Sequence, residues 1–354
     1  MENIRKFHPE DVEESMRLSS FSFQYTLTHK EREAKKAQFQ IDQWFAYTVD
    51  DRLAAQMRIM PMEIWLQGRI WSMGGIASVA TWPEYRRQGC VRKLLVHALK
   101  EMKENDQTVS MLHPFSFSFY RKFGWSAFID YQEWELSMEQ VPKFPLEEMP
   151  GGSFERFTDW TTSAKAMELL AEVYERYAKR YSGALRRNKA WWKGSLTRRK
   201  QGTAVIYRDD QGQLNGYLLY TVKDFKLTIH EWVSCDDQAE RALWSWIRQH
   251  DSMAKQIQLT VPAETDMLYH FSDPMFQRQH QSYFMGRIVD VQRFFERYRF
   301  MEKSGPYQLT IFVEDSYADW NEGAWQIHIA ADGTVQQVEY GDVQSPHIAR
   351  CKIS

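Results

Sequence analysis

Basic residues around a glycine form the first stretch of the chain that could do chemistry, because they could hold a phosphate group. Arg86-Arg87-Gln88-Gly89 follows the apolar run Gly75–Thr81 and precedes apolar residues that recur at helical spacing from Val91 to Met102. The run predicts a buried strand, which Pro83 ends because proline cannot donate to a strand ladder. The start of a helix offers N–H groups and a positive dipole end, and arginines add charge-assisted hydrogen bonds. The stretch therefore predicts a strand, a basic glycine loop and a helix, with an anion site at the loop.

An aromatic stretch further along, Leu112–Trp125, contains a tyrosine that could donate a proton. The hydroxyl of Tyr120, with an ordinary pKa of about 10, is protonated at neutral pH and so can act as a proton donor. Taken singly, each stretch has a plainer interpretation, since a basic loop is usually a solvated turn and clustered aromatics usually pack a core. The occurrence of both stretches in this order favours a functional site.

Together the two stretches resemble the GNAT N-acetyltransferases. Arg86-Arg87-Gln88-Gly89-Cys90-Val91 is similar to their pyrophosphate-binding loop, in which Gln or Arg, two residues, Gly and one residue precede Gly or Ala. Val91 departs from the small last residue of that pattern. Phe119-Tyr120-Arg121-Lys122-Phe123-Gly124-Trp125 resembles the segment that closes the family's motif region. The resemblance implies an α/β GNAT fold, acetyl-CoA as co-substrate, acetyl transfer to a primary amine, and Tyr120 as general acid.

By the same resemblance, the end of the Gly75–Thr81 strand leaves its neighbour and pairs with the pantetheine arm through backbone atoms. The residues expected to bind acetyl-CoA are Val79, Ala80, Thr81, Arg86, Arg87, Gln88, Gly89, Cys90, Val91, Arg92, Phe115 and Ser116. The first helices border the acceptor site in GNAT folds. With the central strand, they give the weaker acceptor-site candidates Phe21, Phe23, Tyr25 and Ser78. The motif region offers no convincing general base.

The composition is that of an ordinary globular protein in a reducing compartment. Hydrophobic residues make up 43% and charged residues 26% of the 354 residues, and the net charge of −2 gives no electrostatic case for nucleic acid or an anionic membrane. Three scattered cysteines form neither a disulfide framework nor a metal-ligand pair. Because no apolar leader opens the chain and no apolar run could span a bilayer, we expect a cytoplasmic protein without a metal, membrane or nucleic-acid partner.

The length of the chain and the order of its elements predict three domains. The first, 1–145, holds both motif stretches and ends at a linker rich in proline and glycine. The second, 146–286, repeats the order of strands and helices, but Ser234-Cys235-Asp236-Asp237 is acidic where the first domain has its basic loop. Because acidic groups repel a pyrophosphate, we expect a degenerate GNAT copy without cofactor.

Strands on either side of the central strand are expected to complete the first domain. Two hairpins should lead into it, Trp44–Val49 with Leu53–Met60 and Glu63–Leu66 with Arg69–Met73. Asp130–Met138 is expected to add a strand pair that closes the domain.

The third domain, 287–354, is expected to start with a helix at Asp290–Tyr298. It should continue as antiparallel strands at Tyr307–Glu314, Ala324–Ala330 and Val335–Tyr340. It resembles the start of a sterol-carrier-protein-like α/β domain, and the three domains in this order resemble the Eis-type acetyltransferases. That resemblance implies a hexamer, and aminoglycosides or lysine side chains as acceptors, to which we add polyamines. Family members end on an aromatic tail whose carboxylate is the general base, so the stop at Arg350–Ser354 predicts a truncated domain.

Two alternatives to the acetyltransferase stay open. One is a non-catalytic sensor or scaffold that binds acetyl-CoA, or a lipid in its last domain. The other is nucleic-acid binding by basic and aromatic residues between Lys179 and Lys200. The balanced net charge favours a helical surface or a subunit contact for that segment.

Overall fold

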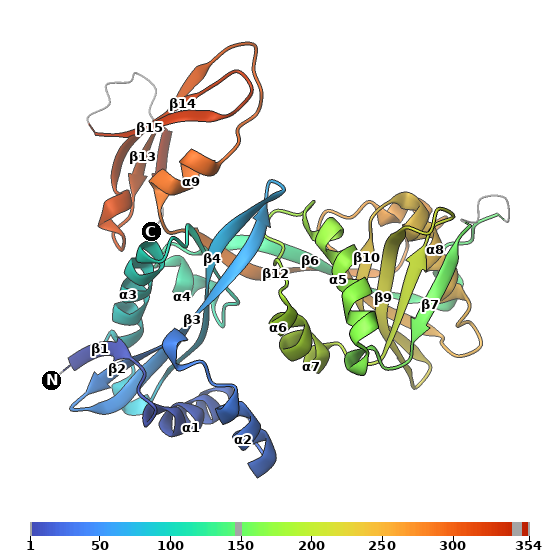
Figure 1. Ribbon diagram of the computed structural model, residues 1–354, viewed down its shortest axis with the longest axis horizontal. Helices are drawn as coiled ribbons and strands as arrows, with labels where there is room; N and C mark the ends of the chain where they lie inside the picture. The colour runs from blue at the N-terminus through green and yellow to red at the C-terminus, as the bar shows by residue number, and fades with distance from the viewer. Residues whose placement is uncertain (1, 146–150, 342–348, 353–354) are drawn as a thin grey trace. The chain divides into compact units, whose positions relative to one another are not determined.

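The computed structural model describes residues 2–145, 151–341 and 349–352, which fall into two compact units (Figure 1). The first unit comprises residues 1–63, 71–128 and 284–354, and the second comprises residues 64–70 and 129–283. Each unit is therefore assembled from segments that are far apart in the chain. No helix in the described ranges is both long enough and apolar enough to cross a membrane.

The main sheet of the first unit has the order β1-β2-β3-β4-β5, and the end of β12 pairs with β5. Its strands are β1 (Glu2–Lys6), β2 (Trp44–Val49), β3 (Arg52–Leu66), β4 (Arg69–Thr81), β5 (Val109–Leu112) and β12 (Gln277–Ile288). The helices of this part are α1 (Asp11–Phe23), α2 (His29–Ala37), α3 (Cys90–Glu104) and α4 (Phe117–Arg121), with 3₁₀ turns at Ile41–Gln43 and Pro83–Tyr85. The expected strand, loop and helix are thus present as β4, the segment after it, and α3.

Helix α3 packs on the sheet through one apolar stripe. The fully buried residues of this stripe are Leu94, Leu95, Ala98, Leu99 and Met102. Their spacing places them on one helix face, and they belong to the same core as Met57 of β3. Because burying a leucine contributes about 1.5–3 kcal/mol, the stripe fixes the helix and the loop that enters it.

Strands β4 and β5 are parallel over only four residue pairs. Met73, Gly74, Gly75 and Ile76 pair with Val109, Ser110, Met111 and Leu112. The hydroxyl of Ser110 donates to the carbonyl of Gly74 at 2.9 Å and ties the strands where they pair. Beyond Ile76, β4 continues to Thr81 while β5 ends at Leu112. β5 therefore offers no pairing to residues 77–81.

A second, four-stranded sheet forms the C-terminal part of the first unit, with the order β15-β14-β13-β16. Its elements are α9 (Val291–Arg297), β13 (Tyr307–Glu314), a 3₁₀ turn (Asp319–Asn321), β14 (Gly323–Ile329), β15 (Val335–Tyr340) and β16 (Ala349–Lys352). Val291 of α9 packs with Ile311, Trp325 and Ile327 of the sheet in a small separate core. The helix and strands predicted here from periodicity are found within about one residue of the expected bounds.

The second unit holds six strands that neighbour one another in the order β6-β11-β10-β9-β8-β7. Its strands are β6 (Ser126–Ser137), β7 (Ser153–Phe157), β8 (Thr203–Arg208), β9 (Leu214–Lys223), β10 (Lys226–Ser234) and β11 (Gln256–Pro262). Its helices are α5 (Ala164–Ala178), α6 (Lys189–Trp191), α7 (Thr197–Arg199) and α8 (Asp237–Arg248), with a π-helical turn at Trp192–Leu196 and 3₁₀ turns at Met138–Gln140, Trp160–Thr162 and Met267–His270.

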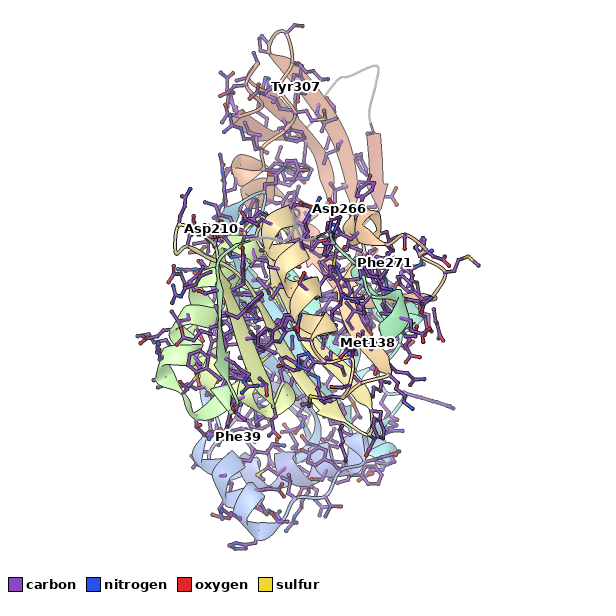
Figure 2. All side chains as sticks on the ribbon, turned by 90° about the vertical axis from the view of Figure 1, so that its right-hand side faces the viewer. Phe39, Met138, Asp210, Asp266, Phe271 and Tyr307 are labelled. Carbon is purple, nitrogen blue, oxygen red and sulfur yellow. The ribbon has the colours of Figure 1, made fainter. Side chains whose placement is uncertain are left out.

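The sheet of the second unit has a core on each face. Leu218 of β9 lies in the core that includes α8, and the next residue, Leu219, lies in the core that includes α5, as the alternation of a strand requires. In the α8 core, Phe271 packs edge-on against Trp134 and Trp244, and Figure 2 labels its position.

The strands of the two units are paired in the same way around the central strand. As in the first unit, the central strand of the second is parallel to its neighbour over four pairs, Lys226–Ile229 with Gln256–Leu259. A bulge between Ile229 and Glu231 follows in β10. In β4, Ser78 holds the left-handed φ of 54° two residues after the last parallel pair. The expected tandem of GNAT folds is confirmed at this level of topology.

One sequence prediction about strands is wrong, and another differs only in strand bounds. Both hairpins expected before the central strand are present, since β2 pairs with β3 and β3 neighbours β4 across the turn at Gln67-Gly68. However, Leu53–Met60 and Glu63–Leu66 are one continuous strand, β3, and Arg69–Met73 continues into the central strand as β4. The strand predicted to close the first domain instead pairs with β11 of the second unit, Tyr131–Ser137 against Gln256–Pro262. In the first unit the place beside β5 is taken by Met285–Ile288 of β12. The boundaries 1–145, 146–286 and 287–354 stay predictions.

Candidate functional site

The loop between β4 and α3 has the backbone shape of an anion site. Arg87 and Gly89 hold left-handed φ angles of 64° and 80°, and Gly89 is the N-cap of α3. No side chain caps the helix, and the first N–H groups of a helix have no acceptor within it. A Cβ atom added to Gly89 would meet nothing within 4 Å. The loop therefore combines helix donors with open space, which suits a phosphate group.

The polar side chains of the loop are exposed, and two of them also bond to its backbone. Nε of Arg86 donates to the carbonyl of Thr81 at 3.4 Å, and Nε2 of Gln88 donates to the carbonyl of Glu84 at 2.9 Å. Arg87 and Arg92 are exposed, and the guanidinium of Arg92 lies 5.8 Å from the ring centroid of Tyr317. Arg87 and Arg92 are therefore the arginines best placed to meet a ligand anion.

Cys90 and Val91, which follow the loop glycine, belong to the core and not to the surface. Cys90 is buried, and its Sγ lies 3.4 Å from the carbonyl of Tyr85. Val91 packs against the core that includes α3. The departure from a small residue at Val91 is thus accommodated by apolar packing.

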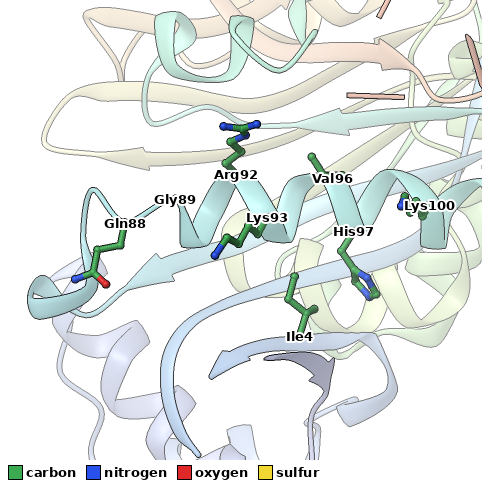
Figure 3. Close-up of a pocket in the computed structure, with 8 residues that line it drawn as sticks. All are labelled: Ile4, Gln88, Gly89, Arg92, Lys93, Val96, His97 and Lys100. Carbon is green, nitrogen blue, oxygen red and sulfur yellow. The ribbon is translucent and has the colours of Figure 1, made fainter. Parts of the chain in front are cut away.

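A pocket of about 600 Å³ runs along α3 from the loop. It is lined by Ile4, Gln88, Gly89, Arg92, Lys93, Val96, His97 and Lys100. Figure 3 shows Lys93 and His97 projecting from the helix on the side of Ile4, with Arg92 leaving on another side. Nζ of Lys93 donates to the hydroxyl of Tyr47 at 2.7 Å, and burial lowers the pKa of His97. The lysines and arginine make this surface suitable for an anionic group.

The end of β4 beyond its pairing with β5 places its side chains on alternate faces. Val79 contacts the core that includes α3, whereas Ala80 lies in the core that includes Leu18 of α1. The hydroxyl of Thr81 is buried and has no hydrogen-bond partner among the described residues. A buried polar atom without a partner is costly, so this edge fits a ligand that supplies hydrogen bonds, such as the amide chain of pantetheine.

Tyr120 lies on α4, which begins where Oγ of Ser116 accepts a hydrogen bond from the amide of Phe119 at 3.3 Å. Tyr120 is only 3% exposed, and its ring packs edge-on against Phe115 and Phe119 at 5.4 and 5.2 Å between centroids. Burial raises the pKa of Tyr120 to about 12. The hydroxyl therefore keeps its proton throughout the neutral range, as a general acid requires.

The structure brings the main predicted residues into one neighbourhood. Tyr120 and Cys90 belong to one core with Leu112, the last residue of β5, and Val79 and Val91 pack against that core. Phe115 is 71% exposed and stands at the surface of this neighbourhood. Within the described ranges, no three His, Cys, Asp or Glu side chains gather in a way that could hold a metal ion.

Only some of the predicted acceptor-site residues lie near the end of β4. Phe21 is half exposed, and its ring lies 5.3 Å from that of Trp82, just after β4. Tyr25 turns toward α2, where Nζ of Lys35 donates to its hydroxyl at 2.5 Å. Phe23 is also half exposed, and Ser78 lies on the part of β4 that has no pairing with β5.

Sequence reasoning missed an imidazole at this edge. His113 is exposed and directly follows Leu112, at the point where the two parallel strands part. Its ring lies edge-on to Phe284 at 5.7 Å. The position of His113 right after a buried strand was the available signal in the sequence.

The corresponding places in the second unit are filled by its own side chains. The carboxylate of Asp236 accepts a hydrogen bond from the amide of Ala239 at 2.7 Å and caps α8. At the bulge of β10, the buried Glu231 accepts hydrogen bonds from Arg187 at 2.5 and 3.1 Å and from Lys200 at 2.9 Å. An acid thus occupies the helix start where the first unit has an uncapped glycine.

The same contacts account for part of the basic segment between Lys179 and Lys200. Arg187 and Lys200 bind Glu231, and the guanidinium of Arg187 lies 3.6 Å from the ring centroid of Tyr174. Arg180 donates to the carbonyls of Ser234 and Cys235. These side chains hold the second unit together, which removes them from a nucleic-acid surface.

Comparison with known protein families agrees with this architecture. Residues 3–128 and residues 183–288 each match a family model described as an acetyltransferase (GNAT) domain. Residues 291–349 match a sterol carrier protein domain. The three domains predicted from the sequence are therefore present in the predicted order.

Individual relatives share this architecture over most of the chain. An uncharacterized N-acetyltransferase of Streptomyces avermitilis is 24% identical over 304 residues, covering 80% of this chain and 71% of the relative. The crystal structure of an Enterococcus faecalis V583 protein described as a probable N-acyltransferase superposes with a TM-score of 0.88 at 25% identity, covering 100% of this chain and 88% of that one. Eis1 from Mycobacterium abscessus has the same fold, with a TM-score of 0.78 at 16% identity over 99% of this chain and 87% of its own.

Proposed function

From the premise that this chain is an acyltransferase of the GNAT family, with acetyl-CoA as the co-substrate of that family, we propose that it acetylates primary amines with Tyr120 as the general acid. The acceptor is an aminoglycoside, a polyamine or a lysine side chain. The main support for this proposal is the burial of Tyr120 near Leu112, where the pairing of β4 with β5 ends. Burial there holds a proton donor beside the expected acetyl-CoA site.

The proposed contacts of acetyl-CoA lie along the end of β4 and the start of α3. We assign the pyrophosphate to the start of α3, where Gly89 leaves open space and Arg87 and Arg92 add positive charge. The pantetheine amides would pair with residues 79–81, and the thioester would lie near Phe115 and Ser116. The lysines of the pocket along α3 would meet the further phosphate of the nucleotide end.

The chemistry needs a proton to leave the amine and another to reach the sulfur. The amine nitrogen attacks the thioester carbonyl, a C–N bond forms and the C–S bond breaks. The Tyr120 hydroxyl donates its proton to the departing thiolate, and the ammonium proton passes to a base and then back to the tyrosinate through solvent. The base is not assigned to any residue of this chain.

The second GNAT domain is proposed to be without co-substrate. Its support is the carboxylate of Asp236 at the start of α8, which repels a pyrophosphate where Gly89 would admit one. A hexamer and a cytoplasmic location are further proposals from the Eis-type resemblance, and light scattering of the purified protein tests the hexamer.

The test is thiol release from acetyl-CoA with spermidine, tobramycin and Nα-acetyl-lysine as acceptors, with native protein and Tyr120→Phe. We expect acceptor-dependent release with at least one amine, and a loss of about 10²-fold or more in kcat in Tyr120→Phe. Acetyl-CoA binding without release with any amine would instead support a sensor or scaffold. Unchanged kcat in Tyr120→Phe would remove the acid role and leave the transferase.

A further inference from the structure

A buried arginine joins the C-terminal part of the first unit to the segment that carries Tyr120. Arg287 lies near the end of β12, and neither its side chain nor that of Asp315 is exposed. Nη2 of Arg287 lies 2.6 Å from both carboxylate oxygens of Asp315. The guanidinium also lies 5.3 Å from the ring centroid of Trp125. A charged pair enclosed in this way is costly unless its geometry is held by further hydrogen bonds.

The other end of the guanidinium reaches the turn after α4. Nη1 of Arg287 donates to the carbonyl of Phe123. The amides of Phe123 and Trp125 in turn donate to the carbonyl of Tyr120 at 2.9 and 3.3 Å. Two hydrogen-bonded steps therefore connect Arg287 to the backbone of Tyr120. Because α4 has only five residues, the turn that ends it contributes much of what fixes the Tyr120 ring.

Asp315 is itself held by a network within the C-terminal part. Nδ2 of Asn321 donates to Asp315 at 3.0 Å, and the amide of Tyr317 donates to it at 3.3 Å. The Oδ1 atom of Asn321 accepts a hydrogen bond from the amide of Val291 at 2.9 Å, where α9 begins. These hydrogen bonds fix the position of the Asp315 carboxylate, which in turn fixes the guanidinium of Arg287.

We propose that Arg287 and Asp315 are positioning residues for Tyr120, through which the sterol carrier protein domain sets the position of the general acid. The proposal rests on the role of Tyr120 given above and names the two residues that hold this tyrosine in position. Neither residue touches the reacting atoms. Their effect is on where the Tyr120 hydroxyl stands relative to the departing sulfur, and small displacements of a catalytic group lower the rate strongly.

The test is a double-mutant cycle with the most active amine of the panel as acceptor. Asp315→Asn removes the anchor charge, and Arg287→Lys keeps the charge but cannot reach the carbonyl and the carboxylate together. Asp332→Asn is the matched control, because this aspartate of the same domain lies in an exposed turn, where its carboxylate accepts a hydrogen bond from the amide of Thr334 at 3.0 Å and lies 3.8 Å from Arg299. Each change is made in the native protein and in the Tyr120→Phe background, and kcat is measured beside the Kd for acetyl-CoA.

We expect Asp315→Asn and Arg287→Lys to lower kcat about tenfold or more in the native protein, with the acetyl-CoA Kd changed less than about threefold. In the Tyr120→Phe background both should cost less than about twofold, because the group they position is gone. Equal losses in both backgrounds, or no loss at all, would overturn the proposal while the acid role stands. If Tyr120→Phe itself kept native kcat, both proposals would fall. Should Asp315→Asn not fold, Arg287→Lys decides the question alone.

Discussion

Ile76 and Leu112 form the last parallel pair between β4 and β5. Past this pair the strands separate, and the loop of Gly89 and the helix of Tyr120 both follow within the next few residues of their strands. In the second unit, Ile229 and Leu259 form the equivalent last pair, but Glu231 and Asp236 follow it. The same topology therefore yields one edge that can receive an anionic co-substrate and one edge already filled by carboxylates.

Gly89→Ala should weaken acetyl-CoA binding in addition to destabilising the protein. The left-handed φ of 80° costs a non-glycine residue about 1–2 kcal/mol, and the new methyl group would stand where the co-substrate approaches. We expect the KM for acetyl-CoA to rise about tenfold or more. Gly212→Ala is a close control, because Gly212 has the same φ and the same open space in a turn of the second unit. Equal KM values for the two variants would show that the α3 loop does not bind the co-substrate.

The pH profile of kcat should show no loss from tyrosine ionisation below about pH 10. Burial raises the pKa of Tyr120 to about 12, so the protonated form, which is the proposed acid, persists until the pH approaches that value. A general acid loses activity as the pH rises through its pKa, so kcat falls there. A general base gains activity as the pH rises through its own pKa, so kcat increases there. Rates from pH 6 to pH 10 with saturating substrates check this, with denaturation followed separately. An alkaline limb near pH 8 that vanishes in Tyr120→Phe would contradict the raised pKa.

Local sequence signals predicted the parts of the site that lie within one element or one loop. The strand, glycine loop and helix were predicted because apolar spacing, Pro83 and Gly89 act over a few residues, and β13 and β15 were predicted from simple alternation. The pairing of β6 with β11 was missed because partner choice between strands depends on contacts made over more than a hundred residues. The contacts of Arg287 were also missed, because Asp315 lies 28 residues away and Phe123 lies 164 residues away, and nothing near any of the three residues signals these contacts.

Replacing Asp236 should cost stability and leave catalysis alone. Its carboxylate caps α8, and loss of such a cap costs about 0.5–2 kcal/mol. We therefore expect Asp236→Ala to lower the unfolding midpoint by a few degrees without changing kcat or the KM for acetyl-CoA. Asp236→Ser, which retains a capping oxygen, should recover most of the midpoint. A changed KM in Asp236→Ala, beyond about twofold, would mean that the second domain does take part in co-substrate binding.

Glu231→Gln should be among the most destabilising single changes in the second unit. The carboxylate is buried with Arg187 and Lys200, and removing one partner of a buried pair leaves uncompensated charge at a cost of about 3–5 kcal/mol. Glu135→Gln is the control, because Glu135 is half exposed and its nearest cation, Lys226, lies 3.8 Å away. An exposed pair of this kind contributes no more than about 1 kcal/mol.

The stability lost in Glu231→Gln should depend on pH, and the direction follows from the pKa shift of Glu231. Although burial opposes ionisation, Arg187 and Lys200 hold the pKa of Glu231 well below its ordinary value of about 4.3. A lowered pKa contributes stability that is complete above the ordinary value and lost as the pH falls toward the folded one. The difference in unfolding free energy between native protein and Glu231→Gln should thus be constant from pH 7 to about pH 5 and shrink only below about pH 4. Urea denaturation at several pH values measures it, and a difference that already halves between pH 7 and pH 5 would mean that the pair does not hold Glu231 ionised.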